Sequence, residues 1–267
     1  MKNQIEKFTN KPVLDRAVGT GVLLASLALA TLSSPAHAAD WSTTNVQLLH
    51  GSSYANDFGI DDKAKTVFTL EHANGWKYGD NFFFVDVSNP TSSNTNHYAE
   101  FSPRLSIGKI TGVDTKFGFV KDVLISGTWE LGDGVRAYLL GVGLALDIPH
   151  FAFADFNLYS RTSHRDFAAA QTDRGYQITL DWLLPFKIGS ASCAFEGFLD
   201  YAWGEGGGSS PKEDNLITAP RLLVDVGSLY GKPNNVQVGI EYQMWRSKFG
   251  IKDVDENVPQ IMVKWTF

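Results

Sequence analysis

The chain ends in the stretch NVPQIMVKWTF, residues 257–267, in which apolar and polar residues mostly alternate. One parity holds Ile261, Val263, Trp265 and Phe267, and the other holds Gln260, Met262, Lys264 and Thr266. Such period-two alternation indicates a β-strand with one apolar and one largely polar face. A strand that occupies the last residues and ends on an aromatic ring is expected where the final strand completes a closed wall. The C-terminus therefore predicts a β-barrel.

The first 38 residues have the organisation of a secretory signal peptide. A basic segment precedes the apolar run Thr20–Leu32, and Ala36-His37-Ala38 has the small-x-small pattern of a cleavage site. The run has thirteen residues, whereas a helix that spans a bilayer needs about 20. We therefore prefer a signal peptide over residues 1–38 to a membrane anchor, and expect the mature domain over residues 39–267.

Composition excludes several classes of protein. The chain has 23 basic and 29 acidic residues, and without residues 1–38 the count becomes 19 against 27, a net charge of −8. An acidic surface argues against binding to a nucleic-acid polymer. Cys193 is the only cysteine, so an internal disulfide and a cysteine-based metal cage are both excluded. The length of the mature domain suits one all-β unit.

Turn-forming residues divide the mature domain into segments that mostly run for about 8 to 14 residues. The twelve predicted strands are residues 43–50, 65–73, 77–88, 97–108, 121–130, 134–148, 151–162, 173–186, 190–203, 217–228, 235–247 and 257–267. Short connectors such as Asn74-Gly75 alternate roughly with longer polar ones such as 89–96 and 204–215. Short turns on one rim and long loops on the other are typical of outer-membrane barrels.

The segments alternate as the last one does. In 173–186 one parity holds Tyr176, Ile178, Leu180, Trp182 and Leu184, and the other holds Gly175, Gln177, Thr179 and Asp181. A soluble sandwich would alternate too, with its apolar side inward. Strands of ten residues or more, an even strand count and aromatic residues at the strand ends favour the membrane. We predict an all-β protein, a twelve-stranded antiparallel transmembrane β-barrel in the outer membrane of a Gram-negative bacterium.

In such a barrel the polar parity faces the lumen, and some aromatic residues share that parity. An aromatic ring among charges can stack on a flat base while the charges bond a sugar, which suits a small amphipathic solute such as a nucleoside. The predicted substrate-binding residues are Asp80, Phe82, Phe84, Asp86, Glu100, Arg104, Tyr159, Arg161, Phe198 and Trp245. In the alternative, the charges form internal salt bridges and the rings only fill the lumen.

Several stretches resemble the Tsx-type nucleoside-specific channel family of the outer membrane. They are EFSPRLSIGKITG (100–112), KFGFVKDVLISGTW (116–129), AYLLGVGLALDI (137–148) and GIEYQMWRS (239–247). The family pattern of an acidic residue followed by Pro-Arg-x-Ser-Ile is matched by Glu100, Pro103, Arg104, Ser106 and Ile107. Residues 50–64 and 204–215 depart from the family.

The resemblance implies a monomeric barrel with a narrow lumen and passive uptake of nucleosides, which aromatic and ionisable residues bind weakly. It also implies a possible second role as a phage or colicin receptor. No cofactor is implied.

Two other functions stay open. An outer-membrane phospholipase needs a Ser/His pair on the lipid-facing side; His72 lies on the apolar parity, but no serine partner is evident. No His-x-His or His-x-x-x-His spacing marks a metal site.

The second of these other functions is that of a surface receptor, a plugged barrel that displays loops 89–96, 164–172 and 204–215. Ion conductance separates such a receptor from a channel.

Overall fold

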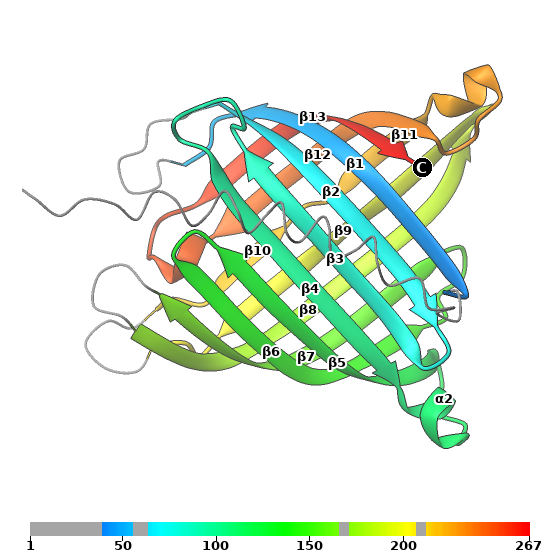
Figure 1. Ribbon diagram of the computed structural model, residues 1–267, viewed down its shortest axis with the longest axis horizontal. Coiled ribbons are helices and arrows are strands. Elements are labelled where there is room, and N and C mark those ends of the chain that lie inside the picture. The colour runs from blue at the N-terminus through cyan, green and yellow to red at the C-terminus, as the bar shows by residue number, and fades with distance from the viewer. Residues whose placement is uncertain (1–38, 56–63, 166–170, 207–211) are drawn as a thin grey trace, which may run out of the picture. The chain divides into compact units, whose positions relative to one another are not determined.

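The computed structural model describes residues 39–55, 64–165, 171–206 and 212–267, which form one antiparallel sheet closed on itself (Figure 1). β1 (Trp41–Ser52) pairs with β2 (Ala64–Trp76) on one side and with β13 (Glu256–Thr266) on the other. The last strand therefore pairs with the first and leaves no free edge, as the C-terminal sequence predicts. The other strands are β3 (Gly79–Ser88), β4 (Asn96–Ser106), β5 (Val120–Gly132), β6 (Val135–Leu146), β7 (Phe153–Arg165), β8 (Gln171–Ile188), β9 (Ala191–Trp203), β10 (Asn215–Thr218), β11 (Arg221–Asp225) and β12 (Val236–Arg246).

β10 and β11 together occupy one position in the wall, because both pair with β9 on one side and with β12 on the other. Thirteen strands thus fill a ring of twelve positions, and the twelve-stranded fold is confirmed. The predicted strand 217–228 is wrong in detail: it breaks at Ala219-Pro220 and ends at Asp225. Proline has no N–H for the ladder, and a 3₁₀ helix, η1 (Gly227–Tyr230), follows the second half.

The predicted strand 97–108 is also too long. β4 ends at Ser106, whose side-chain oxygen accepts a hydrogen bond of 3.0 Å from the backbone N–H of Lys109. The short helix α2 (Ile107–Thr111) starts there and ends at Gly112, which has a φ of 75°. A serine N-cap and a left-handed glycine are the ordinary signals of a helix start and stop, but Ile107 continued the apolar alternation and hid them.

The dipeptide Asn74-Gly75, predicted as a turn, lies inside β2, and the chain reverses at Lys77 and Tyr78 instead. The indole of Trp41 covers Gly75 so closely that a Cβ there would lie 2.1 Å from the indole nitrogen. This glycine therefore serves a close approach between strands rather than a turn.

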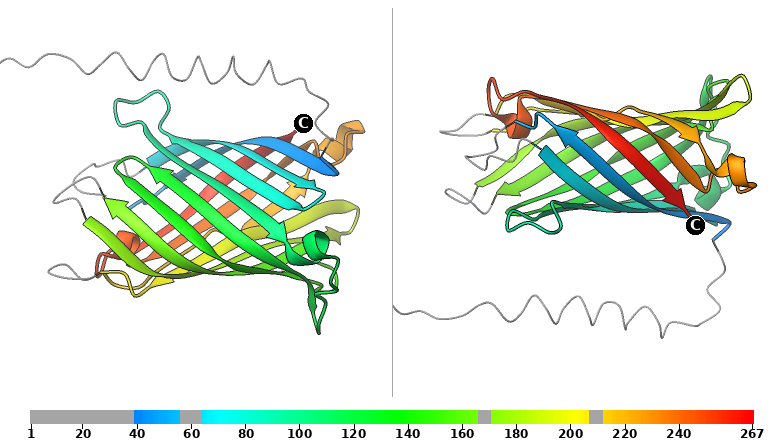
Figure 2. Two further views of the ribbon diagram at one scale, coloured as in Figure 1. Left: turned by 60° about the horizontal axis from the view of Figure 1, so that its bottom comes forward. Right: turned by 90° about the horizontal axis from the view of Figure 1, so that it is seen from above.

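Two rims bound the wall (Figures 1 and 2). We call the rim that contains both ends of the barrel chain the terminal rim; its connections are 77–78, 107–119, 147–152, 189–190 and 226–235. At the opposite loop rim β1, β3, β5, β7, β9 and β12 end, and the described connections there include 89–95, 133–134 and 247–255. The tight turn at Asp133 lies on the loop rim, so short and long connections are not sorted strictly by side.

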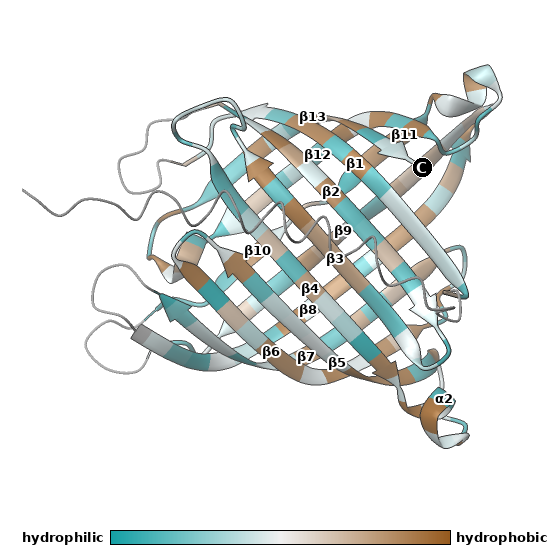
Figure 3. Ribbon diagram, in the orientation of Figure 1, coloured by the Kyte–Doolittle hydropathy of each residue, from teal (hydrophilic) through white to brown (hydrophobic). Residues whose placement is uncertain are grey.

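Hydrophobic and hydrophilic residues alternate along the strands (Figure 3), and side-chain exposure places the hydrophobic set on the outer face. Leu140, Val142 and Ile261 expose 67%, 50% and 68% of their surface, whereas Gln47 and Asn157 expose 1% and 2%. A soluble sandwich would bury the first group and expose the second. An apolar belt of this extent is the lipid-facing surface of a membrane barrel.

Exposed aromatic pairs border the belt near both rims. Trp265 and Phe267 stack with ring centroids 5.5 Å apart at the terminal rim. Trp129 and Tyr138 do so at 6.1 Å on β5 and β6 towards the loop rim. Aromatic girdles of this kind sit at the membrane–water boundaries.

The signal-peptide prediction over 1–38 falls outside the described residues, and the loops 164–172 and 204–215 are described only in part. No helix in the described ranges is long and apolar enough to cross a membrane.

Candidate functional site in the barrel lumen

An aromatic run lies on the inner wall of β3 and β4. The ring centroids of Phe82 and Phe84 are 5.9 Å apart, and those of Phe84 and Tyr98 are 5.8 Å apart. Phe84 stands opposite Glu71 on β2 and Glu100 on β4, both polar residues of the inner face. The structure thus brings the predicted residues Phe82 and Phe84 together.

Tyr98 is a member of this run that the sequence analysis missed. Its hydroxyl donates a 2.6 Å hydrogen bond to the Glu100 carboxylate. The available signal was its shared parity with Glu100, at the start of the strand. None of the ion pairs among the described residues includes Glu100. A carboxylate outside the described ion pairs therefore lies beside the Tyr98 and Phe84 rings.

The predicted residues Arg104 and Asp80 neutralise each other. The Arg104 Nε lies 2.7 Å from an Asp80 oxygen, and its Nη1 lies 2.9 Å from Asp155 on β7. The side chain reaches Asp155 across β5 and β6, where the inward residues Gly141 and Gly143 have no side chain. Arg104 on β4 therefore ties β3 and β7 together along the wall.

Tyr159 is part of the wall rather than an open platform. It is 3% exposed, packs with Ala137 and Leu139, and its hydroxyl lies 2.7 Å from the Ser126 hydroxyl. Its ring is too covered to stack on a solute, which agrees with the alternative that some rings fill the lumen.

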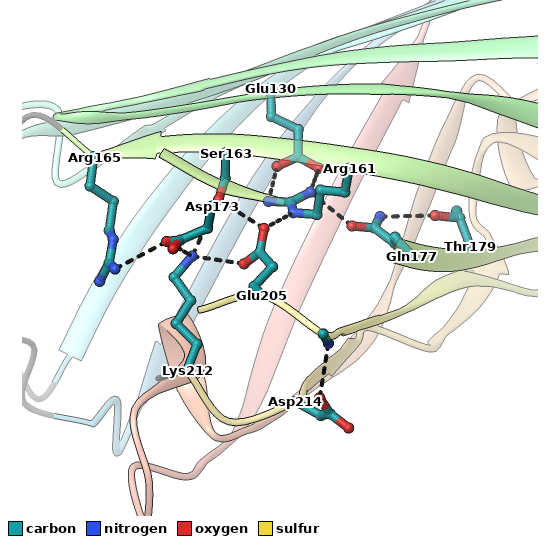
Figure 4. A network of polar contacts seen from close by, with 11 residues as sticks. Glu130, Arg161, Ser163, Arg165, Asp173, Gln177, Thr179, Glu205, Lys212 and Asp214 are labelled. Carbon is teal, nitrogen blue, oxygen red and sulfur yellow. Dashed lines mark hydrogen bonds and ion pairs between the residues drawn. The ribbon is translucent and has the colours of Figure 1, made fainter. Parts of the chain in front are cut away.

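Arg161 is the centre of a second polar network (Figure 4). Its guanidinium binds the Glu130 carboxylate through two hydrogen bonds of 2.5 and 2.7 Å, and it also donates to Gln177 at 2.8 Å. Its Nε donates to Glu205 at 3.1 Å. Such two-pronged pairing fixes the guanidinium firmly, so Arg161 holds the wall and a loop rather than standing free.

The connection between β9 and β10 folds onto this network, and we call its two ends, 204–206 and 212–214, the strap. Glu205 accepts hydrogen bonds from Ser163 at 2.8 Å and from the Lys212 ammonium at 2.7 Å. Lys212 also pairs with Asp173 at 3.2 Å. Figure 4 shows Glu205 and Lys212 pointing towards Ser163 of β7 and Asp173 of β8. Burial alone would raise the pKa of Glu205, but Arg161 and Lys212 outweigh it and hold that pKa below its ordinary value.

On the other side of the barrel, Arg221 and Lys264 form a third network. The Arg221 Nε lies 2.6 Å from Glu241, and its Nη1 lies 3.6 Å from Glu196. Lys264 reaches the same Glu196 at 2.8 Å. The basic lumen residues are thus paired, as the salt-bridge alternative predicts.

The remaining predicted residues are scattered. β9 lies across the ring from β3. Phe198 on β9 pairs in the register with Asp181 of the neighbouring β8. Asp200, also on β9, accepts a hydrogen bond of 2.5 Å from the Thr179 hydroxyl. Asp86 accepts from Thr69 at 2.5 Å on the β2–β3 side.

Trp245 lies near the loop rim, apart from the aromatic run. Its ring centroid is 4.7 Å from that of Phe249, and the Lys248 ammonium lies 5.0 Å above it. Trp245 therefore belongs to a loop-rim cluster of the β12–β13 connection.

An apolar row also crosses the inner wall, which the sequence analysis did not predict. Leu49, Met262, Leu223 and Ala194 are each at most 5% exposed and form one cluster. Gly239 lies between Met262 and Leu223 in the register. The lumen is consequently polar but interrupted by an apolar band.

Taken as chemistry, the lumen offers one wall of aromatic rings beside the Glu100 carboxylate, while the arginines are neutralised by neighbouring acidic residues. Such a surface can stack on a flat solute and accept hydrogen bonds from its hydroxyl or amino groups. Among the described residues no group of His, Cys, Asp and Glu is arranged to hold a metal ion.

Comparison with known proteins places the chain. The profile of the family described as "Nucleoside-specific channel-forming protein, Tsx" matches residues 38–266. Outer membrane protein OmpK of Vibrio parahaemolyticus is 26% identical over 261 residues, which cover 87% of this chain and 92% of that protein. The nucleoside-specific channel-forming protein Tsx of Escherichia coli O157:H7 is 24% identical over 189 residues, 64% of each chain.

Among solved structures, the NanC porin aligns with a TM-score of 0.49 and 15% identity, over 83% of this chain and 98% of that one. The closed wall, the apolar belt and the family match together define a channel protein of the Gram-negative outer membrane. The chain belongs to the Tsx family of nucleoside-specific channel-forming proteins.

Proposed function

We propose that this barrel admits nucleosides, or small solutes of similar shape, by passive diffusion into the periplasm. A nucleoside has a flat apolar base and a polar sugar, so its passage needs rings beside hydrogen-bonding groups. Weak binding is enough, because a solute that is held tightly does not leave the channel.

The observation that carries the proposal is the aromatic run Phe82–Phe84–Tyr98 with Glu100 at its side. A base can stack on these rings, and the Glu100 carboxylate, which accepts from Tyr98 through one oxygen, can accept from a sugar hydroxyl through the other. The predicted contact on the facing wall is Phe198, and Asp200 lies two residues further along the same strand. Arg104, Arg161 and Tyr159 contribute by holding the wall in shape.

Uptake of radiolabelled thymidine and adenosine tests the proposal, in cells that lack their own outer-membrane nucleoside channels. Expression of this chain should raise the initial uptake rate at low external nucleoside, where diffusion across the outer membrane limits the flux. Uptake equal to that of cells with an empty vector would contradict the proposal, provided that the barrel is present in the outer membrane.

A receptor role is a second candidate, supported by the strap and by the β12–β13 connection. The backbone N–H of Glu213 donates to the Gly250 carbonyl at 2.9 Å, so two loop-rim connections pack together. An ordered loop surface suits recognition by a phage or a colicin. Binding without conductance would favour this role as the main one.

The structure offers little to the enzyme alternative. The His72 ring nitrogen lies 2.7 Å from the Thr44 hydroxyl on the outer face, and its other close neighbour is the Phe83 ring. The family is one of channels rather than enzymes.

A further inference from the structure

The connection between β4 and β5 exposes more apolar surface than a water-covered loop ordinarily does. Ile110, Val113, Phe117 and Phe119 expose 50%, 61%, 60% and 74% of their surface. The connection starts with α2 and projects away from the barrel axis at the terminal rim (Figures 1 and 2). We call residues 107–121 the foot.

The foot carries an open groove of about 560 Å³. Residues 117–120 form one side, and Leu146, Ile148 and Pro149 form the other, so the lining is almost wholly apolar. Main-chain hydrogen bonds hold its shape: the Val120 N–H donates to the Phe117 carbonyl at 2.8 Å, and the Asp147 N–H donates to the Phe119 carbonyl at 2.7 Å. The groove therefore does not depend on its apolar side chains for its backbone structure.

The foot carries three lysines and one aspartate, a local excess of positive charge, although the whole chain has a net charge of −6. Lys109, Lys116 and Lys121 are all exposed. Of the nearby carboxylates, Asp114 accepts from the backbone N–H of Lys116 at 3.0 Å and Asp122 accepts from Thr115 at 3.1 Å, while the Asp147 side chain is exposed beside the groove. The three ammonium groups are thus available to an external anion.

The groove is also continuous with the lipid-facing belt. It lies at the terminal-rim ends of β5 and β6, whose outward residues Ile125 and Val142 pair with each other and are 48% and 50% exposed. Acyl chains that cover these strands reach the groove directly, and the headgroup layer lies at the same level as the rim.

We propose that the foot binds an anionic phospholipid of the leaflet that meets the terminal rim, with an acyl chain in the groove and the phosphate against the lysines. Basic residues near a membrane surface favour anionic lipids, and exposed aromatic residues anchor at the same depth. This site is separate from the lumen and does not depend on which solute crosses it.

Native mass spectrometry of the detergent-solubilised barrel with equimolar phosphatidylglycerol and phosphatidylcholine tests the proposal. The wild-type barrel should retain the anionic lipid at least about fivefold more, the factor that one basic residue contributes. Lys109→Gln, Lys116→Gln and Lys121→Gln together should bring the two lipids close to parity. Phe117→Ser with Phe119→Ser should lower retention of both.

A matched control exists on the same rim. Leu229→Ser with Lys232→Gln changes an exposed apolar and a basic residue of the β11–β12 connection, outside the groove, and should leave the lipid preference unchanged. Equal retention of the two lipids by the wild type, or an unchanged preference in the triple lysine variant, would overturn the proposal.

A second measurement does not depend on detergent. A maleimide fluorophore on Phe119→Cys should be quenched by brominated acyl chains in phosphatidylglycerol vesicles, since the native Cys193 is buried. The same label on Ser92→Cys, at the loop rim, should be quenched by aqueous iodide instead. Strong iodide quenching at position 119 would show that the foot lies in water and would contradict the site.

Discussion

Phe83 and Phe84 are neighbours in the sequence but face opposite sides of β3. Phe84 contacts Tyr98 on the lumen side, whereas Phe83 lies 5.6 Å from the His72 ring and pairs with Phe101, which is 44% exposed to the outside. In a strand a shift of one residue exchanges the two faces. This pair therefore places one ring on the lumen side and the next ring on the outer side of the same strand.

Phe84→Ala should weaken binding of a nucleoside in the lumen by between about 5-fold and 100-fold, the range that loss of one stacked ring produces. Phe83→Ala should leave binding unchanged and lower only the stability or the insertion yield of the barrel. The nucleoside concentration that halves the single-channel current measures binding, and the temperature at which the folded gel band disappears measures stability. Equal effects on binding would refute the assignment of the two faces.

At this scale parity predicted which side of the wall a residue faces, but not what it touches there. The prediction grouped Tyr159 and Trp245 with Phe84, yet Tyr159 bonds Ser126 within the wall and Trp245 lies under Lys248. The alternation of apolar and polar residues along one strand does not reveal these partners, because they lie on other strands or in loops. The shared parity of Tyr98 with Glu100 placed it on the inner face as well. Only its contact with Phe84 on β3 shows that it extends the aromatic run.

Among the elements, the strap has the clearest dependence on pH. The pKa of Glu205 is held below its ordinary value in the folded state. Its contacts with Arg161 and Lys212 therefore stabilise the strap fully when the pH is above the ordinary pKa of a glutamate. That stabilisation is lost as the pH falls through the lowered pKa of the folded state. We expect current noise from strap motion to be low near neutral pH and to rise in acid.

Glu205→Gln should make the channel noisy already at neutral pH, because the strap loses its charge-assisted bonds. Asp133→Asn, an exposed change in a loop-rim turn, is the control and should behave as the wild type. Quiet currents from Glu205→Gln at neutral pH would contradict the role of this carboxylate in holding the strap.

β12 depends on the absence of a side chain at Gly239. A Cβ at this position would lie 1.9 Å from the Leu222 carbonyl oxygen of β11, so the two strands would have to shift. We expect Gly239→Ala to destabilise the barrel by about 1–3 kcal/mol. Gly127→Ala on β5, where a Cβ would meet its nearest neighbour at 3.5 Å, should be nearly neutral, and chemical denaturation in detergent compares the two.

Alternation predicted the strands well but located their ends poorly. Ile107 continued the period of β4 although Ser106 caps a helix there, and Pro220 interrupted a strand whose flanking residues alternate normally. Capping and the loss of one N–H are single-residue events, whereas a period is an average over many residues. The strap could not be predicted, because Glu205 meets Arg161 across 44 residues of sequence.

For the whole molecule, the closure of the barrel and its two unlike faces follow from the sequence pattern. The arrangement of side chains in the lumen follows from pairing between residues far apart in the sequence. The apolar parity covers the outside, so the unlike faces and the final strand together specify a barrel in a bilayer. The interior depends on ion pairs such as Lys264 with Glu196, which are 68 residues apart. These pairs leave the β3–β4 wall as the open aromatic surface.

The outer belt makes the barrel dependent on an amphiphile. Residues 39–267 should remain monomeric and folded in detergent and should aggregate when the detergent is removed, because exposed side chains such as Leu140 and Ile261 lose their cover. Size-exclusion chromatography with light scattering measures this. A compact, monodisperse monomer in plain buffer would refute the membrane assignment.

Single-channel recording of purified residues 39–267 in planar bilayers tests the central claim, a nucleoside-binding passage through the lumen, most directly. The account predicts small, uniform conductance steps that adenosine or thymidine reduces in a concentration-dependent way, while ribose, which lacks a base to stack, does not. Insertion of folded barrels without any conductance, or conductance that nucleosides leave unchanged, would contradict it.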